Sequence, residues 1–315
     1  MKIKNKAKIM FPQIYEYYLH IKRVNKIHKT KKLKKLDVES QKKYISKEYK
    51  RKMGHELDWN NLKTYTEKMQ WEKIFNNDPQ KTILSDKFLV RNWVSKKLGK
   101  DVLIPLIGVW NSFDEIDFNK MPNEFVLKTN HGSGTNIIVK DKINFDYKLA
   151  RQKFNDWMKM DFGYTNSIQK HYSKIDRKII AEKYIVNASG DLQDYKFLCF
   201  NGNPRFCWVD KGRFSNHTRT VFDMNWKQQP WTQSNYGVSK TEIPKPKNFN
   251  KMIKYAEILS KGFKQVRVDL YNINGKIYFG EMTFTNGSGF DCIVPEKYDE
   301  ILGTYWNING EKNEK

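Results

Sequence analysis

Two carboxylates in otherwise apolar segments are the first candidates for chemistry in this sequence. Asp269 stands in Arg-Val-Asp-Leu and Glu281 in Phe-Gly-Glu-Met-Thr, with Asn274-Gly275 between the two segments. Asn-Gly between apolar runs predicts a tight β-hairpin, which would bring both carboxylates onto one face. Such a pair suits Mg²⁺ that is also bound to phosphates. A buried salt bridge from Asp269 to Arg267 or to a lysine is the alternative.

A lysine followed by a glycine turn is the second candidate. Lys128 ends an expected strand at 125–128, and His-Gly-Ser-Gly at 131–134 precedes another strand at 136–139. The amine can reach a nucleotide phosphate while backbone N–H groups of residues 132–135 close over the others. Because P-loops and Rossmann turns lead into helices, this turn is a hairpin flap of another kind. A purely structural turn is the alternative.

The third candidate is an apolar strand that contains an acid, Ile179-Ile-Ala-Glu182-Lys-Tyr-Ile185. Backbone groups after such a strand can read an adenine edge, with the acid near the amino group or the ribose. A plain strand is the alternative.

The elements that must position these residues are short and show no repeat. We expect helices over residues 9–27, 64–75 with Thr66 as N-cap, 85–98, 148–160 and 249–262. Strands are expected at 103–107, 125–128, 136–139, 178–186, 195–200, 205–209, 265–271 and 276–284. Residues 210–248 are predicted to form a loop that covers the substrate. Strands and helices that interleave in this way indicate an α+β fold rather than a doubly wound sheet.

Composition and charge limit the class of protein. The chain has 315 residues with a net charge of +23, and 39% of them are hydrophobic, which excludes a disordered protein. Residues 1–55 hold 18 Lys and Arg against four acids, which gives +14, so the other 260 residues carry only +9. The charge excess is therefore N-terminal, and it argues against a nucleic-acid-binding body.

The N-terminal segment predicts a basic amphipathic helix, because apolar residues recur at helical spacing between Ile9 and Ile27. Adsorption to anionic lipid is one interpretation; packing on the body of the protein with a solvated basic face is the other. No stretch is apolar enough to span a membrane, and three cysteines without CxxC spacing fit a reducing compartment. We expect a cytoplasmic protein that can be peripheral on the inner face of the cell membrane.

Taken in order, these segments resemble the TupA-like family of the ATP-grasp superfamily, which is associated with teichuronopeptide and other bacterial surface-polysaccharide biosynthesis. The resemblance extends from about residue 66 to 303. It rests on Ser-Asp-Lys-Phe at 85–88, the 125–134 segment, Ala-Glu-Lys-Tyr-Ile at 181–185, Asp-Tyr-Lys-Phe at 194–197 and the 266–285 segment. It implies an ATP-grasp fold, in which two α+β lobes with antiparallel sheets grip ATP.

The resemblance also implies roles for individual residues. Lys87 and Lys128 would reach phosphates under a flap made by Gly132, Ser133, Gly134 and Thr135. Glu182 and the backbone of Lys183, Tyr184 and Ile185 would hold adenine, and Asp194 ribose or metal. Lys196 would contact phosphates, Arg267 would stabilise the transferred phosphoryl group, and Asp269, Glu281 and Thr283 would bind Mg²⁺. Many relatives have Asn where this chain has Thr283, so one metal ion is better supported than two.

The implied reaction is an ATP- and Mg²⁺-dependent ligation of a carboxylate to an amine through an acyl phosphate, on a cell-surface polysaccharide or its precursor. Substrate contacts are expected from the 210–237 loop, at Lys211, Arg213, His217 and Arg219, with Trp226 and Trp231 as flat surfaces for a sugar. The alternatives are a glycosyltransferase of the same pathway and a non-enzymatic basic protein that binds membranes or nucleic acid.

The expected organisation has four parts. Residues 1–60 form the basic helical segment, 61–120 an entry subdomain, 121–303 the nucleotide-binding and catalytic lobes, and 304–315 a tail. The expected partners are a small-molecule amine, a glycan or lipid-linked glycan, and an anionic membrane surface at residues 1–55, without nucleic acid.

Overall fold

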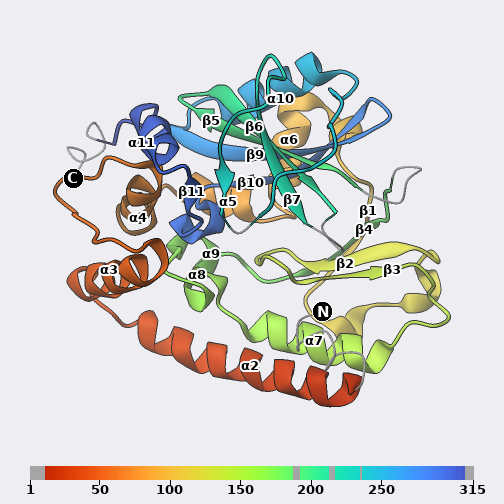
Figure 1. Ribbon diagram of the computed structural model, residues 1–315. Coiled ribbons are helices and arrows are strands. Elements are labelled where there is room, and N and C mark those ends of the chain that lie inside the picture. Colours follow the sequence, from red (N-terminus) through yellow and green to blue (C-terminus); the bar gives the residue numbers. More distant parts are fainter. Residues whose placement is uncertain (1–10, 187–191, 213–216, 235, 309–315) are drawn as a thin grey trace.

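Two antiparallel sheets lie one above the other, and helices cover their outer sides (Figure 1). The computed structural model describes residues 11–186, 192–212, 217–234 and 236–308. The smaller sheet has the order β1-β4-β2-β3 and is built from β1 (Leu106–Trp110), β2 (Phe125–Thr129), β3 (Asn136–Val139) and β4 (Ile179–Lys183). The predicted α+β class is confirmed.

The larger sheet has the order β10-β9-β5-β6-β7. Its strands are β5 (Asp194–Phe200), β6 (Asn203–Lys211), β7 (Thr218–Asp223), β9 (Gln265–Ile273) and β10 (Lys276–Thr283). A small third sheet pairs β8 (Thr232–Gln233) with β11 (Ile293–Val294). Asn274 and Gly275 both have positive φ, at 54° and 96°, so the hairpin of β9 and β10 has the turn that Asn-Gly predicts.

Helices complete the two lobes. They are α2 (Pro12–Leu33), α3 (Val38–Met53), α4 (Tyr65–Phe75), α5 (Pro79–Ser85), α6 (Val90–Leu98), α7 (Tyr147–Lys159), α8 (Phe162–Thr165), α9 (Lys170–Ser173), α10 (Phe249–Ser260) and α11 (Lys297–Thr304). None of the helices among the described residues is long and apolar enough to cross a bilayer.

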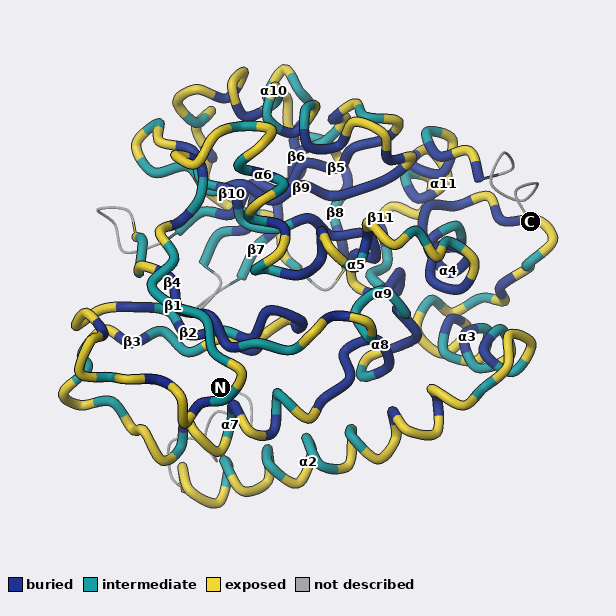
Figure 2. Tube along the Cα trace, turned by 180° about the vertical axis from the view of Figure 1, so that it is seen from behind, coloured by how far each residue is buried: buried dark blue, intermediate teal, exposed yellow. Residues whose placement is uncertain are grey.

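Three apolar cores formed by described residues hold these layers together; the central strands of the larger sheet are mostly buried (Figure 2). One joins the smaller sheet to α7, and alternation along β2 assigns Phe125 and Leu127 to this core, where they meet Phe154. A second lies between the larger sheet and α10. The third covers the opposite face of the larger sheet, and there Trp208 shares a core with Ile45 of α3. The N-terminal helices are thus part of the packed structure.

The proposed domain boundaries remain predictions, and contacts cross each of them. The Tyr49 hydroxyl lies 2.9 Å from Thr66 Oγ1 across residue 60. Strand β1 pairs with β4 across residue 120, and Lys68 Nζ donates to the Trp306 carbonyl at 2.7 Å across residue 303.

One predicted N-cap and one predicted helix start are wrong, for the same physical reason. The N-cap of α4 is Thr64 rather than Thr66, because Thr64 and Glu67 form a reciprocal capping box. The helix expected over 85–98 begins at Val90, because Asp86 Oδ1 accepts hydrogen bonds from the backbone N–H of Phe88 and Leu89. In both places a side chain satisfies backbone donors that would otherwise stay unpaired.

The 210–248 region is also different from the prediction of a loop, because it contains β7 and β8. Strand β7 pairs with β6 from Phe206↔Asp223 to Lys211↔Thr218 and so forms the edge of the larger sheet. At the N-terminus, α2 continues to Leu33, beyond the expected end at residue 27. Residues 1–10, with the start of that expected helix, lie outside the described residues.

Candidate functional site

A cavity of ≈ 370 Å³ lies between the two sheets and collects most of the residues singled out in the sequence. From the smaller lobe it is lined by Lys87, Lys128, Gly132, Ser133, Gly134, Thr135, Glu182, Lys183, Tyr184 and Ile185. From the larger lobe it is lined by Asp194, Asp269 and Glu281. Arg267, Lys196 and Thr283 stand directly behind Asp269 and Glu281 as their hydrogen-bond partners.

Lys87 reaches the cavity from a tight turn between α5 and α6. Asp86 fixes this turn, since it caps the backbone of Phe88 and accepts from Asn130 Nδ2 at 2.9 Å. Lys87 Nζ donates to the Gly132 carbonyl, which ties the amine to the flap. Burial lowers the pKa of Lys87, although Glu281 acts in the opposite direction. An amine that has already lost water is well placed to meet an anionic ligand.

Lys128 is held by a buried acid. Strand alternation places Val126 and Lys128 on the cavity face of β2, opposite the face that packs on α7. Glu182 Oε2 accepts from Lys128 Nζ at 2.5 Å, and its Oε1 accepts from Arg91 at 2.9 Å. Glu182, which the resemblance assigns to adenine, therefore bridges two cations in this structure and orients the lysine.

The flap between β2 and β3 is a closed hairpin, as predicted. Thr129 N donates to the Thr135 carbonyl at 3.1 Å, and the two threonine hydroxyls lie 2.7 Å apart. Ser133 and Gly134 are exposed at the tip. His131 is buried against Phe162, and burial lowers its pKa to about 4, so it is neutral at pH 7.

The hairpin of β9 and β10 places the two predicted metal ligands side by side. Glu281 is the cross-strand partner of Asp269, and Thr283 that of Arg267. The register shifts between Phe279 and Glu281, so Gly280 forms a bulge. Without this extra residue, the alternation along β10 would turn Glu281 to the opposite face from Asp269.

Both sequence interpretations of Asp269 find support in its contacts. Its Oδ1 accepts from Arg267 Nε at 2.6 Å, and its Oδ2 accepts from Arg267 at 2.6 Å and Lys196 Nζ at 2.7 Å. The alternative of a buried salt bridge is therefore present, and the same carboxylate lines the cavity. Burial alone would raise the pKa of Asp269, but Arg267 and Lys196 outweigh it and hold the pKa at about 2.

Glu281 is the more accessible of the two carboxylates. Its side chain is 40% exposed, whereas that of Asp269 is 2% exposed. Its Oε1 accepts from Arg267 at 3.0 Å and from the Thr283 hydroxyl at 3.2 Å. Arg267 thus lies within hydrogen-bonding distance of both carboxylates and of Thr283, and it also donates to Asn286.

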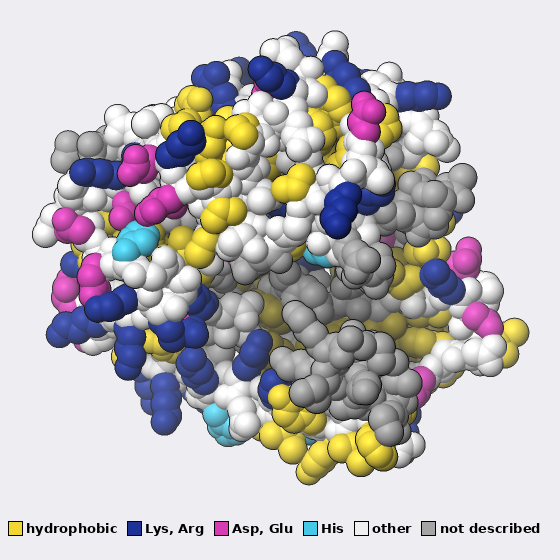
Figure 3. Space-filling model, viewed as in Figure 1, with side chains coloured by type: hydrophobic (Ala, Val, Ile, Leu, Met, Phe, Trp, Pro, Cys, Tyr) yellow, Lys and Arg dark blue, Asp and Glu magenta, His cyan; other side chains and the backbone are white. Residues whose placement is uncertain are grey.

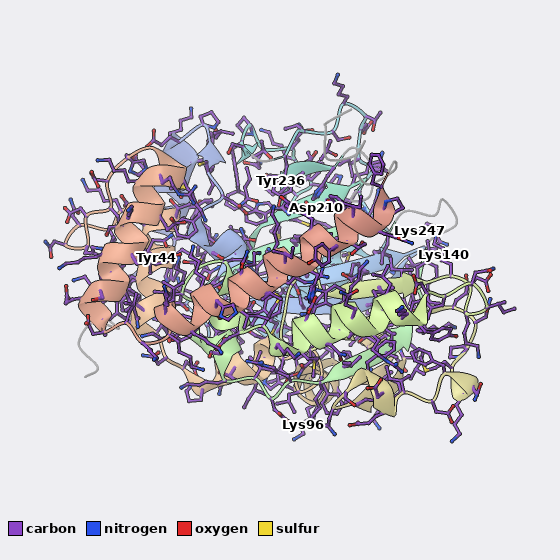
Figure 4. The ribbon with its side chains drawn as sticks, turned by 90° about the horizontal axis from the view of Figure 1, so that it is seen from below. Tyr44, Lys96, Lys140, Asp210, Tyr236 and Lys247 are labelled. Carbon is purple, nitrogen blue, oxygen red and sulfur yellow. The ribbon has the colours of Figure 1, made fainter. Side chains whose placement is uncertain are left out.

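Of the four residues expected to contact the second substrate, the three that the structure describes do not line the cavity. Arg219 is buried and makes two hydrogen bonds to Asp210, at 2.6 and 2.7 Å; Asp210 and Tyr236, which flank it, lie close together in Figure 4. His217 Nε2 is 3.6 Å from the same carboxylate. Lys211 donates to Thr241 at 3.3 Å, and Arg213 lies outside the described residues.

The expectation of two flat tryptophan surfaces for a sugar does not fit the burial of Trp231, whereas Trp226 is half-buried. Trp231 is 3% exposed and belongs to the core beneath the larger sheet. Trp226 stacks on Phe222 with ring centroids 4.2 Å apart. Both rings support the sheet edge formed by β7.

Apolar residues that line the cavity were missed by the sequence analysis. They are Ile104, Val126, Ile138, Val186, Leu192 and Tyr271. Alternation offered a signal for two of them, because Val126 precedes Lys128 by two positions and Ile138 is the cross-strand partner of Val126. Such side chains form the walls that a flat heterocycle requires.

The residues in this cavity fit ATP and Mg²⁺. Two lysines and a glycine flap offer donors for phosphates, and Asp269 and Glu281 offer the oxygen ligands that Mg²⁺ prefers. Within the described residues no group of three or more His, Cys, Asp or Glu can hold a metal ion. Since Mg²⁺ is commonly bound by one or two carboxylates plus phosphates and water, the pair suits an ion that arrives with the nucleotide.

Comparison with known proteins gives one match over most of the chain. The family model described as TupA-like ATPgrasp matches residues 67–307. No curated protein matches the chain.

Solved structures that resemble this one are remote. The D-alanine–D-alanine ligase of Bacillus anthracis shows 16% identity and a TM-score of 0.38, over 74% of this chain and 70% of that one. The Helicobacter pylori enzyme shows 15% and 0.34, over 71% and 62%. The ATP-grasp ligase PsnB, complexed with a variant precursor, Mg and ADP, shows 9% and 0.39, over 75% and 64%.

Proposed function

The chain belongs to the TupA-like ATP-grasp family, and from this premise we propose the reaction that it catalyses. The family is one of ATP-dependent ligases of the carboxylate–amine kind. In our proposal this protein joins an amino acid or another amine to a carboxylate of the uronic-acid type, on a bacterial cell-surface polysaccharide or its precursor. ATP is converted to ADP and phosphate in the process.

One observation carries the catalytic part of the proposal. The cavity between the sheets brings two lysines and a glycine flap from the smaller lobe opposite Asp269 and Glu281 from the larger lobe. Donors for a triphosphate and ligands for its metal ion therefore face each other across one space. Arg267 stands beside both carboxylates, where it can stabilise charge that develops on a transferred phosphoryl group.

The proposed reaction has two steps. An oxygen of the substrate carboxylate attacks the γ-phosphorus, the bond from that phosphorus to the bridging oxygen breaks, and ADP leaves with the electron pair. The amine nitrogen then attacks the acyl carbon, the acyl carbon–oxygen bond breaks, and phosphate leaves while the nitrogen gives up a proton. Both steps pass through anionic groups that need neutralisation.

The residues of the chain supply that neutralisation. Lys87 and Lys128 offer ammonium groups to the phosphates, and the Gly132–Thr135 backbone covers them and excludes water from the reactive anhydride. Asp269 and Glu281 would hold Mg²⁺, which neutralises phosphate charge and makes the γ-phosphorus more electrophilic. Lys196 balances the charge of Asp269 and Asp194. Thr283 orients Glu281 through its hydroxyl.

The polysaccharide substrate is supported by the sequence resemblance to enzymes of surface-polysaccharide biosynthesis. Its acidic character agrees with the basic side chains near β6 and β7. Of these, His217 is partly exposed and Lys211 lies at the end of β6. Either side chain can approach a substrate carboxylate at the edge of the larger sheet.

An isotope experiment tests the proposal directly. The full-length protein is incubated with ATP, Mg²⁺, mixed amino acids and a uronic-acid glycan whose carboxylates carry ¹⁸O. We expect glycan-dependent ADP release and one ¹⁸O atom in each phosphate, because the carboxylate oxygen leaves with phosphorus. Glu281→Gln should abolish both, whereas Glu242→Gln, an exposed control, should retain them.

Two results would overturn the proposal. One is phosphate without ¹⁸O although ADP is released, since the carboxylate would then not be the nucleophile. The other is consumption of a sugar nucleotide without ADP release, which would indicate a glycosyltransferase.

A further inference from the structure

Helix α2 is attached to the protein by one face and leaves an apolar stripe on the other. Ile14, Tyr17, Tyr18 and Ile21 follow the spacing i, i+3, i+4, i+7 and are 67, 64, 44 and 41% exposed. Phe11, just before the helix, is 55% exposed. A surface helix normally turns such a stripe toward the core. Here the residues of the stripe are exposed instead, and α2 is exposed along much of its length (Figure 2).

The inner face of α2 is held largely by ion pairs. Arg23 Nε and His20 Nδ1 lie 2.7 and 2.8 Å from the same Asp156 oxygen on α7. Glu16 accepts from Lys153 Nζ at 2.9 Å. These contacts, together with packing on α7 and α8, fix the rotation of the helix about its axis. The outward direction of the apolar stripe is therefore built into the structure.

Positive charge surrounds this stripe. Glu16 is the single acid of α2, and it is paired with Lys153. The six basic residues of the helix are Lys22, Arg23, Lys26, Lys29, Lys31 and Lys32, and all of them except Arg23 are exposed. Lys22 Nζ lies 4.5 Å from the ring centroid of Tyr18, so charge and apolar surface meet directly. Figure 3 shows hydrophobic side chains gathered at the base of this face, with Lys and Arg beside them.

We propose that the outward face of α2 adsorbs to a membrane surface rich in anionic lipid. Aromatic and aliphatic side chains flanked by lysines are the composition of a helix that lies in the bilayer interface. The net charge of +14 over residues 1–55 is complementary to anionic headgroups. The stripe itself is short, about two helical turns, so charge and apolar contact act together.

The position of α2 leaves the catalytic cavity free when the helix is adsorbed. The smaller sheet has α7 on one face and the cavity on the other, since Phe125 and Leu127 meet α7 while Val126 and Lys128 line the cavity. Helix α2 packs beside α7 at the base of the smaller lobe (Figures 1 and 4). The membrane would thus contact the base of the smaller lobe.

Vesicle flotation with the full-length protein tests this inference. We compare vesicles of phosphatidylcholine alone with vesicles that contain about a quarter phosphatidylglycerol, at low and high salt. We expect binding to the anionic vesicles, weakening with salt because the charges are screened. Ile14→Ser/Ile21→Ser should lower the partition coefficient about tenfold or more. The matched control Ile143→Ser/Ile301→Ser, at positions 87 and 40% exposed, should change it less than about twofold.

Charge reversal separates the electrostatic contribution. Lys22→Glu/Lys29→Glu/Lys32→Glu should abolish binding to anionic vesicles, whereas reversal of the exposed Lys96, Lys148 and Lys240 should retain most of it. Thermal unfolding verifies that each variant is folded. ATP binding is a second check, because α2 does not line the cavity. The inference is overturned by absence of vesicle binding in the wild type, by equal binding to neutral vesicles, or by equal loss in the controls. It is also overturned if Ile14→Ser/Ile21→Ser dissociates a dimer in sedimentation velocity without changing vesicle binding.

Discussion

Lys196 and Asp269 lie 73 positions apart in the sequence, yet Lys196 Nζ is 2.7 Å from Asp269 Oδ2 in the interior of the larger sheet. The two residues are cross-strand partners on β5 and β9. The same amine also pairs with Asp194. One buried cation therefore serves two buried carboxylates, and their electrostatic balance depends on it.

Removal of that amine should destabilise the protein strongly. Lys196→Met leaves Asp194 and Asp269 with less compensation, and breaking a buried pair costs about 3–5 kcal/mol. Urea unfolding at pH 7 measures the free energy of unfolding. Lys240→Met, at an exposed position, should change it by less than about 0.5 kcal/mol. An unchanged unfolding midpoint for Lys196→Met would contradict the structure.

The raised pKa of Asp299 predicts that the free energy of unfolding falls as the pH rises. Asp299 accepts from the Thr66 backbone N–H at 3.0 Å, and burial raises its pKa from 3.8 to about 6. The folded state thus binds the proton more tightly than the unfolded state. Protonation of Asp299 contributes roughly 2–3 kcal/mol to the free energy of unfolding below pH of about 4. This contribution is lost as the pH rises through about 6. In Asp299→Asn this decline should be absent from unfolding curves measured across that range; an identical decline would disprove the assignment.

The two flap glycines should respond differently to alanine. A Cβ at residue 132 would lie 2.7 Å from the buried Phe162 ring, so Gly132→Ala must displace the flap or the ring. Residue 134 has open space but a φ of +70°, so Gly134→Ala should cost only about 1–2 kcal/mol of backbone strain. Titration with ATP should show the larger loss of affinity for Gly132→Ala. Unchanged affinity in both variants would mean that the flap does not cover the nucleotide, and the reverse order would contradict the role given to the packing of Gly132 on Phe162.

The Arg91–Glu182–Lys128 chain separates direct from indirect contact with ATP. Lys128→Met should weaken ATP binding about tenfold to hundredfold, because a charge-assisted hydrogen bond contributes about 1.5–3 kcal/mol. Arg91→Met should have a smaller effect, since Arg91 acts by holding Glu182. Arg91→Lys should restore part of it, and the exposed Lys148→Met serves as control. Equal losses for Arg91→Met and Lys128→Met would contradict this division of roles.

Local patterns in the sequence predicted the hairpins well. Asn274-Gly275 and the glycine flap are set by backbone preferences within a few residues, and the strands on either side are short and apolar. The cavity residues Lys128, Asp269 and Glu281 followed, because they sit at fixed positions on those hairpins. The resemblance then joined segments that local patterns cannot connect.

Other features of the fold were not predicted, mainly because they depend on pairing between residues far apart in the sequence. Strand β7 was predicted as part of a loop, because residues 210–248 are rich in aromatic residues, Arg and Pro. The burial of Arg219 on this strand depends on Asp210 of the neighbouring strand. The N-cap at Thr64 and the turn at Asp86 were missed although their partners are local; a search for Thr-x-x-Glu would have found the first. The contact of Lys196 with Asp269 could not be predicted, because it depends on the register of two distant strands.

The N-terminal helices α2 and α3 connect the two lobes. Helix α2 packs on α7, which covers the smaller sheet, whereas α3 contributes side chains to the core beneath the larger sheet. The connection between them is the short stretch of residues 34–37. Any rotation that widens the space between the sheets must be absorbed by that stretch or by sliding of α2 over α7. If the exchange of ADP for ATP requires such a rotation, then that exchange and the attachment of α2 to an external surface would both depend on residues 34–37.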